Sequence, residues 1–403
     1  MRVIEFKAQG KPEQFNAIDS AIRTVQFIRN KALRFWIDGL GKSQYDLNKY
    51  CAVLAKEFSF CKDLNSMARQ ASAERAWSGI SRFHDNCKKS VPGKKGFPTF
   101  QKNNRSVEYK SSGWKLSETR KRITFTDKKG IGTLKLKGTW DLNYYQLDQI
   151  KRVRLVRRAD GYYVQFVIRA ENRIDSQPTG KTIGLDVGLK EFYTDSNGHT
   201  EPNPRFYRAS EKRLKFRQKR VSRKKKGSAN RKKAINRLQR VHLKISRQRV
   251  EHAKRLARCV IQSNDLVAYE DLRIKNLVKN HCLAKSINDA GWYQFRKWLE
   301  HFGVKFGKVT VAVNSAYTSQ ECSNCGAIVK KSLSTRTHAC GCGLVLDRDW
   351  NAAINILKIA LSTLGHSGTW ILDPNASGDL TSTLVGAILL GQVESMNEES
   401  PRL

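Results

Sequence analysis

One short apolar stretch, residues 181–190 (KTIGLDVGLK), most constrains the fold of this 403-residue chain. Its composition is typical of a buried strand, yet it carries one acid, Asp186, where a carboxylate without a partner would be costly. A cation or a metal ion is the usual partner of such an acid. The stretch therefore predicts both a buried strand and a charged site on it.

Two later stretches repeat this combination of apolar sequence and acid. Residues 266–272 (LVAYEDL) end an apolar strand on Glu270, and residues 347–355 (DRDWNAAIN) open a helix with Asp349. Carboxylates on separate elements suit metal-dependent hydrolysis of a phosphodiester, because Mg²⁺ binds through few carboxylates together with the substrate phosphate. We expect Asp186, Glu270 and Asp349 to be the catalytic residues and the ligands of two Mg²⁺ ions.

Charge limits the partners of the chain. It holds 75 Lys and Arg against 36 Asp and Glu, a formal net charge of +39. Such a field attracts polyanions and releases their condensed counterions, so nucleic acid is the expected partner. An anionic membrane is the competing interpretation, but no apolar run approaches the roughly 20 residues of a spanning helix. The first residues also lack the apolar core of a signal peptide, so a cytoplasmic protein without a membrane partner is expected.

Periodicity separates helical from strand-rich regions. Apolar residues recur at helical spacing over residues 12–33 and 45–89, whereas residues 106–170 form short runs typical of a β-barrel or curled sheet. From residue 181 the order is a strand with one acid, a hairpin, helices, a strand ending in the second acid, a helix, a strand and a last helix with the third. This is the order of an RNase H-like fold.

A long basic region lies between the first two acids. Over residues 205–258 only Glu211 and Glu251 are acidic among many Lys and Arg, and residues 222–228 divide the region into two helices. The second helix has one apolar face, so its other face is cationic. We interpret that face as a nucleic-acid groove; a bare basic surface is the alternative.

Four of the nine cysteines are clustered. Cys322 and Cys325 have the spacing of a tetrahedral Zn²⁺ knuckle, and Cys340 and Cys342 supply a second pair. We expect all four to bind one structural zinc ion; four reduced thiols on a disordered hairpin are the alternative. The other five cysteines are expected to be buried thiols: Cys51, Cys61, Cys87, Cys259 and Cys282.

The three acid stretches, with residues 318–326 (TSQECSNCG), resemble the RuvC-type nuclease of TnpB, the RNA-guided endonuclease of insertion sequences. That family is related to compact type V CRISPR effectors. The resemblance is strong over residues 181–360, weaker over residues 1–180 and absent after about Leu361. The family has two residues between the second pair of cysteines where this chain has one, so Cys340 is the weakest of the four predicted ligands and His338 its natural substitute.

The resemblance implies a multidomain α+β protein. It would bind a guide RNA and double-stranded target DNA. The sequence does not determine the oligomeric state, for which a monomer is our expectation. The implied parts are the first strand of a wedge domain (1–10), a helical recognition domain (11–90), a β-barrel wedge domain with a linker (91–180), a RuvC-like nuclease (181–315 and 347–360), an inserted zinc ribbon (316–346) and a tail expected to be disordered (361–403).

The family pattern also chooses between neighbouring acids. The Asp directly before x–Asn–Ala–Ala binds metal, which is Asp349, so Asp347 is interpreted as a helix cap. Asp271 is expected to be exposed because successive strand residues point to opposite faces. Three further residues are expected to support the site: Arg348, Asn351 and Asn355.

Three functions share this pattern. The first is an RNA-guided DNA endonuclease encoded by a transposable element, which cuts beside a short flanking motif. The alternatives are a compact type V CRISPR effector and a guided DNA-binding repressor that has lost cleavage; the repressor is disfavoured because all three acids remain. A guide-independent resolvase would share the fold, but the zinc ribbon and the basic region argue against it.

Overall fold

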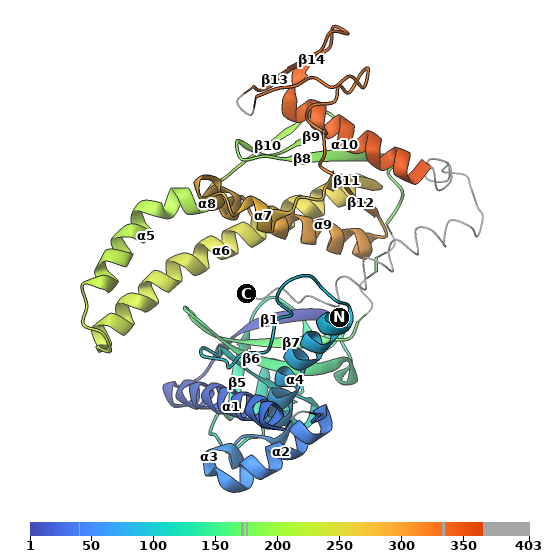
Figure 1. The fold of residues 1–403 in the computed structure, drawn as a ribbon. Coiled ribbons are helices and arrows are strands. Elements are labelled where there is room, and N and C mark those ends of the chain that lie inside the picture. The colour runs from blue at the N-terminus through green and yellow to red at the C-terminus, as the bar shows by residue number, and fades with distance from the viewer. Residues whose placement is uncertain (40, 171–172, 175, 333–334, 366–403) are drawn as a thin grey trace, which may run out of the picture. The chain divides into compact units, whose positions relative to one another are not determined.

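The computed structural model describes residues 1–39, 41–170, 173–174, 176–332 and 335–365. The chain divides into two compact units, residues 1–172 and 173–403 (Figure 1). None of the described helices has both the length and the apolar character needed to cross a membrane. Most of the tail predicted to be disordered lies outside the described residues; the last described helix, α10, continues to Gly365, five residues beyond its expected end.

The first unit contains a seven-stranded antiparallel sheet in the order β2-β6-β7-β1-β5-β4-β3. The first strand of the chain lies in the middle of this sheet, between two strands that come more than a hundred residues later. No ladder joins the outer strands β2 and β3 within the described residues, so the sheet is an open half-barrel where the sequence predicted a barrel or curled sheet. The strands are β1 (Arg2–Gln9), β2 (Ser106–Tyr109), β3 (Trp114–Leu116), β4 (Arg122–Phe125), β5 (Thr133–Lys137), β6 (Ile150–Arg158) and β7 (Gly161–Ile168).

The helices predicted from the periodicity are present, and they cover the inner face of this sheet. Ile4 and Phe6 of β1 point inward and share a core with Ile18 and Ile22 of the first helix, while Lys7 points to solvent. The helices of this unit are α1 (Pro12–Asp38), α2 (Gln44–Glu57), α3 (Ser59–Lys62) and α4 (Ser66–Lys88), with short 3₁₀ turns at Ser111–Gly113, Leu142–Tyr144 and Leu147–Gln149.

The second unit contains a five-stranded mixed sheet in the order β10-β9-β8-β11-β12. The pairs β8–β11 and β11–β12 are parallel, whereas β9 and β10 continue the sheet as an antiparallel hairpin beside β8. The strands are β8 (Thr182–Val187), β9 (Glu191–Asp195), β10 (Thr200–Pro202), β11 (Leu266–Glu270) and β12 (Val309–Val313).

Helices lie on both faces of this second sheet (Figure 1). Ile183 and Leu185 of β8 pack against the helices α6 and α9, while Leu266 and Ala268 of β11 pack against α10 on the other face. The helices are α5 (Phe206–Ser222), α6 (Ala229–Ser263), α7 (Ile274–Leu277), α8 (His281–Ala290), α9 (Trp292–Phe306) and α10 (Arg348–Gly365).

The basic region forms two antiparallel helices, α5 and α6, separated at the point that the sequence indicated (Figure 1). Their apolar sides meet through Leu214, Val241 and Ile245, so the many Lys and Arg residues are left toward solvent. The helix α9 is mainly a core element, because Phe295, Leu299 and Phe302 are buried.

The prediction that the five scattered cysteines are buried is correct for two of them and wrong for three. Cys51 and Cys61 are buried, whereas the other three thiols are exposed, because their helices present them on the solvent side. The exposed thiols are Cys87, Cys259 and Cys282.

Candidate active site

Strand register brings the first two acids together. In the parallel pairing of β8 with β11, Ala268 lies beside Gly184. Two residues further along each strand are Glu270 and Asp186, and side chains two residues apart point to the same face. Both carboxylates therefore lie at the carboxyl ends of neighbouring central strands, on the face that α10 covers.

A close approach between α10 and β8 adds the third acid. A Cβ atom placed on Gly184 would lie 2.2 Å from the carbonyl oxygen of Ala353, so only glycine admits the helix at this distance. Ala353 lies one helical turn after Asp349. A Cβ atom on Gly188, just beyond β8, would lie 4.0 Å from Oδ2 of Asp349, which places this carboxylate at the end of the strand that carries Asp186.

The electrostatics of the three acids are those of a crowded anionic cluster. The pKa of Asp186 is raised well above its usual value, first by burial and then by the charges of Glu270 and Asp349, with Arg348 acting in the opposite direction. Burial also raises the pKa of Glu270, although a hydrogen bond from Thr318 lowers it. A divalent cation would relieve both effects, so the residues fit such an ion.

Two guanidinium groups currently pair with the third acid. Oδ2 of Asp349 accepts a hydrogen bond from Nη1 of Arg336 at 2.9 Å, and Oδ1 accepts from Nε and Nη2 of Arg348 at 3.1 and 2.9 Å. Trp350 fixes the start of the same helix, because its ring N–H donates to the carbonyl oxygen of Ser196 at 3.1 Å. The carboxylate of Asp349 is therefore held in place.

The structure separates the neighbouring acids as the sequence predicted. Oδ1 of Asp347 accepts hydrogen bonds from the backbone N–H groups of Asp349 and Trp350 at 2.8 and 3.3 Å, which is the role of a helix cap. The side chain of Asp271 is 58% exposed and pairs with Arg296. Both side chains are therefore engaged in other contacts, although the charge of Asp347 also raises the pKa of Asp186.

The two asparagines of α10 bind the segment before the cysteines rather than the acids. Asn351 donates to the carbonyl oxygen of Glu321 at 2.8 Å and accepts from the N–H of Ser323 at 2.9 Å. Asn355 donates to the carbonyl oxygens of Thr318 and Glu321 at 2.9 and 2.8 Å. Their expected supporting role thus takes the form of contacts between α10 and the residues leading into the knuckle.

Two site residues were missed by reasoning from the sequence. Thr318 lies in the stretch that carries the resemblance, but nothing in that stretch indicates that its hydroxyl reaches Glu270. Arg336 lies in the polar connection between the cysteine pairs, where one more cation among 75 Lys and Arg gives no signal. Both contacts depend on how the chain folds back, which spacing does not reveal.

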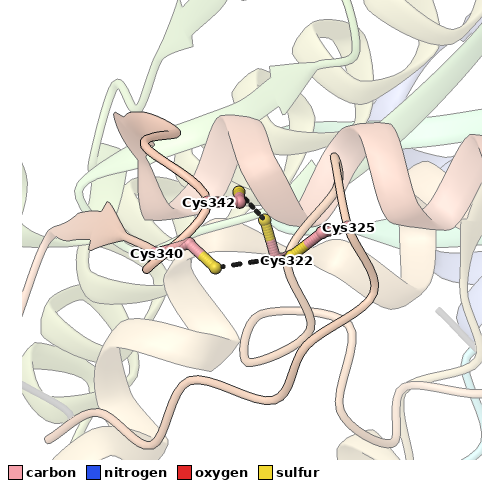
Figure 2. Close-up of side chains that lie close together, drawn as sticks. All are labelled: Cys322, Cys325, Cys340 and Cys342. Atoms are coloured by element: carbon pink, nitrogen blue, oxygen red, sulfur yellow. Dashed lines mark hydrogen bonds between the residues drawn. The ribbon is translucent and has the colours of Figure 1, made fainter.

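The four clustered cysteines converge (Figure 2). Their sulfur atoms all lie within 4.8 Å of one another, with Cys322 and Cys342 3.7 Å apart and Cys325 and Cys340 3.5 Å apart. A tetrahedral ion with bonds of about 2.3 Å to sulfur places its ligands about 3.8 Å apart. The geometry thus fits a four-coordinate metal ion.

Within the described residues, the four thiols form a group that could hold a metal ion. Each pair of cysteines lies in its own turn, and the strands β13 (Thr337–Ala339) and β14 (Val345–Asp347) form a hairpin around the second pair.

Cys342 and His338 differ in their readiness to bind metal. The N–H of Leu344 and the side chain of Asn324 lower the pKa of Cys342 to about 6, which favours the thiolate that metals bind. The buried ring of His338 lies instead beside Lys331, and Cys340 is the residue within the thiol group. The structure therefore places Cys340, rather than its proposed substitute, among the candidate ligands.

Two family models match parts of the second unit, and one of them begins in the last strand of the first unit. A model described as "Probable transposase" (OrfB_IS605) matches residues 165–281, and one described as "Cas12f1-like, TNB domain" matches residues 292–356. The first match contains Asp186 and Glu270, and the second contains Asp349 and the four clustered cysteines.

Curated relatives match most of the chain. A protein of Streptomyces pristinaespiralis named "Putative RNA-guided DNA endonuclease" is 30% identical over 378 residues, 90% of each chain. The InsQ protein of Escherichia coli K12, which has the same description, is 27% identical over 331 residues, 77% of this chain and 78% of its own.

A solved structure shows a similar fold. Cas12f1 in a complex with a single guide RNA and target DNA matches 86% of this chain and 83% of its own with a TM-score of 0.54 and 16% identity. This likeness concerns the fold alone, whereas the Streptomyces relative is 30% identical over 90% of the chain. The chain therefore belongs to the TnpB family of RNA-guided DNA endonucleases.

Proposed function

We propose that this protein cuts target DNA by metal-dependent hydrolysis at Asp186, Glu270 and Asp349, guided by a bound RNA and next to a short flanking motif. The observation that carries the proposal is the convergence of three acids from β8, β11 and α10 on one face of a sheet. The strongly raised pKa of Asp186 supports it, because such a shift is typical of carboxylates arranged for a cation.

Each of the three acids has its own role in the proposed metal site. Asp186 and Glu270 present carboxylates from two rigid strands, which fixes their separation. Asp349 approaches from the helix and would hold the metal in place of its present partner Arg336. When bound, Mg²⁺ would activate a water molecule for in-line attack and stabilise the departing 3′ oxygen. Two such ions are the number that this chemistry commonly uses.

The four cysteines are proposed to hold one structural zinc ion. Four thiolates close the coordination sphere and leave no position for a substrate, so the ion stabilises the ribbon rather than acting in chemistry. The sulfur separations and the lowered pKa of Cys342 support this assignment.

A guide RNA and double-stranded target DNA are the proposed partners. The net charge of +39 favours them, and so does the pattern of cations in both units. In the first sheet, Lys7 lies opposite Lys137 and Arg122 lies opposite Lys135, all on the exposed side. Like charges directly opposite destabilise a sheet, so these pairs gain from a phosphate backbone laid across them.

The domain names follow from the same proposal. The strand order β10-β9-β8-β11-β12, with its antiparallel hairpin and parallel core, supports an RNase H-like (RuvC) nuclease. The seven-stranded sheet and the helices of the first unit would be the wedge and recognition domains, and residues 316–346 a zinc ribbon inserted before the last helix.

The experiment that tests the proposal begins with the RNA. The gene is expressed with its native flanking DNA, the protein is purified, and the RNA that accompanies it is sequenced. One discrete RNA that runs from the 3′ end of the gene into neighbouring DNA is expected, and it defines a target for a cleavage assay. A repeat-spacer transcript would instead favour a CRISPR effector, and random host RNA would contradict guiding altogether.

Matched variants then assign the chemistry. Asp186→Ala and Glu270→Ala are expected to abolish cutting in Mg²⁺ while RNA binding persists. Asp271→Ala, which changes the exposed neighbour of Glu270, is expected to cut normally. A Glu270→Ala protein that still cuts would contradict the site, and an unmodified protein that binds its target without cutting in Mg²⁺ or Mn²⁺ would favour the repressor.

A further inference from the structure

A threonine hydroxyl holds the second acid of the site. Oγ1 of Thr318 donates a hydrogen bond to Oε1 of Glu270 at 2.5 Å. Thr318 is only 3% exposed, so this bond forms in a place largely closed to water. Hydrogen bonds to ionised acceptors are short and strong, and this one occupies one of the two carboxylate oxygens. The side chain of Glu270 is therefore restrained by a group that has no catalytic chemistry of its own.

Thr318 is itself held by the helix that carries the third acid. Its backbone carbonyl accepts a hydrogen bond from Nδ2 of Asn355 at 2.9 Å, and the same nitrogen donates to the carbonyl of Glu321 at 2.8 Å. Asn355 is 4% exposed and lies six residues after Asp349. A short chain of hydrogen bonds thus links the helix of Asp349 to the carboxylate of Glu270.

The backbone before Thr318 has an unusual conformation. Tyr317 has a φ of +65°, in the left-handed region that tyrosine rarely adopts, although its side chain is exposed and packs into no core that would explain it. Its carbonyl oxygen accepts the N–H groups of Gln320 and Glu321, both at 2.9 Å, which closes a turn. Such strain persists where the surroundings fix it, and here the turn directs Thr318 toward Glu270.

The other end of this segment is fixed at the cysteine knuckle. Asn351, which is fully buried, binds the carbonyl of Glu321 and the N–H of Ser323 on either side of Cys322. The segment 317–323 therefore contacts the knuckle at one end and Glu270 at the other, with α10 between them.

We propose that Thr318 is a positioning residue that fixes the carboxylate of Glu270 for metal binding, and that the cysteine knuckle and α10 together hold Thr318 in place. The inference rests on the proposed function, because it takes Glu270 to be a metal ligand. It gives the ribbon a role in the active site, because the ribbon would orient a ligand on β11.

The test compares two substitutions of similar size. Thr318→Val keeps the shape of the side chain and removes the hydroxyl, whereas Thr318→Ser keeps the hydroxyl. The readout is Mn²⁺ binding to the full-length protein without DNA, measured by titration calorimetry, together with the Mg²⁺ dependence of cleavage. Removal of a residue that orients a ligand typically weakens metal binding about 10- to 100-fold.

We expect Thr318→Val to bind Mn²⁺ about 10- to 100-fold more weakly and to recover cleavage at high Mg²⁺, while Thr318→Ser behaves as the unmodified protein. Thr337→Val, an exposed threonine of the same ribbon, is the control and is expected to change nothing. Unchanged Mn²⁺ binding in Thr318→Val, or equal weakening in Thr318→Ser, would overturn the positioning role.

Two further measurements keep the outcomes distinct. Glu270→Gln sets the effect of losing the ligand itself: if it binds Mn²⁺ normally, the proposed active site fails, whereas if only Thr318→Val binds normally, the positioning role alone fails. Zinc content reports whether Thr318→Val keeps its ribbon. If Thr318→Val loses zinc, Asn355→Ala is tested in its place, because this variant releases the backbone of Thr318 and keeps the hydroxyl. Weaker Mn²⁺ binding in Asn355→Ala supports the inference, and unchanged binding contradicts it.

Discussion

Gly184 of β8 lies so close to Ala353 of α10 that a Cβ atom on the glycine would be 2.2 Å from the alanine carbonyl oxygen and 2.9 Å from the backbone nitrogen of Leu357. Both obstacles are backbone or lie next to it, so no side-chain rotation relieves them. The contact sets the distance between the strand that carries Asp186 and the helix that carries Asp349. Gly184 is therefore a packing requirement of the active site as well as of the core.

The first prediction follows from this contact. Gly184→Ala should push α10 away from β8, lower the free energy of unfolding by about 1–3 kcal/mol, as overpacking commonly does, and weaken Mn²⁺ binding. Thermal melting and metal titration of the full-length protein check it. Gly79→Ala is the control, because its new Cβ meets only Pro98 at 3.6 Å in the interior of a helix. Normal metal binding in Gly184→Ala would mean that the contact does not set the geometry of the acids.

The second prediction concerns how much an ionised Asp186 lowers the free energy of unfolding in the absence of metal. Because burial and neighbouring carboxylates raise its pKa in the folded state, the folded protein binds a proton there more tightly than the unfolded chain does. The resulting stability is complete below the unfolded pKa of about 3.9 and is lost as the pH rises toward the raised value. Asp186→Asn removes this loss.

Asp186→Asn should therefore be more stable than the unmodified protein in EDTA at neutral pH, because the amide places no charge beside Glu270 and Asp349. The difference should grow as the pH rises, should reverse in Mg²⁺, which stabilises only a protein that binds it, and should accompany loss of cleavage. Melting curves in EDTA and in Mg²⁺ at several pH values test it. If the variant were less stable than the unmodified protein in EDTA, ionised Asp186 would not destabilise the folded state.

The third prediction concerns zinc. The purified protein should contain one zinc ion per chain, and Cys322→Ser should lose it, because Cys322 is the buried member of the four thiols. Loss of zinc should expose the ribbon to proteases, since metal binding and folding are coupled in such small modules. Metal analysis and limited proteolysis provide the measurement, with Cys87→Ser, an exposed thiol outside the group, as the control. A Cys322→Ser protein with full zinc content would contradict the four-cysteine site.

Much of the second unit could be predicted from the sequence because its helices and strands are determined by neighbouring residues. The apolar runs around Asp186 and Glu270 indicate strands, and parallel strands joined through helices place their carboxyl ends at one edge of a sheet. The break at residues 222–228 and the cap at Asp347 are likewise set by neighbouring residues. Short-range patterns of this kind can be recognised without knowledge of distant contacts.

The features that could not be predicted from the sequence depend on contacts between residues far apart in the chain. The pairing of Thr318 with Glu270 spans 48 positions, and that of Arg336 with Asp349 joins an irregular connection to a helix. The open edge of the first sheet depends on how strands pair, which alternation alone does not fix. The exposure of Cys87, Cys259 and Cys282 also depends on which helix faces find a partner.

The last prediction concerns a buried ion network in the first unit. Glu108 of β2 is 4% exposed and accepts hydrogen bonds from Arg75 at 3.2 Å, Arg152 at 2.8 Å and Arg154 at 2.7 Å. Burial alone would raise its pKa, but the three guanidinium groups outweigh burial and lower the pKa from 4.5 to about 2. The ionised carboxylate of Glu108 thus neutralises part of the charge of three guanidinium groups, and Glu74 also pairs with Arg152 at 3.3 Å.

Glu108→Gln should destabilise the first unit by about 1–3 kcal/mol at neutral pH, because three partly exposed guanidinium groups lose their shared carboxylate. Since the folded pKa is depressed, the stability from Glu108 is complete above about pH 4.5 and is lost as the pH falls toward about 2. The difference between the two proteins should therefore shrink over this range. Hydrogen exchange of the amides in β2 and β6, with the exposed Glu118→Gln as the control, measures it. A difference that stays constant from pH 5 to about pH 3 would show that the charge of Glu108 does not supply this stability.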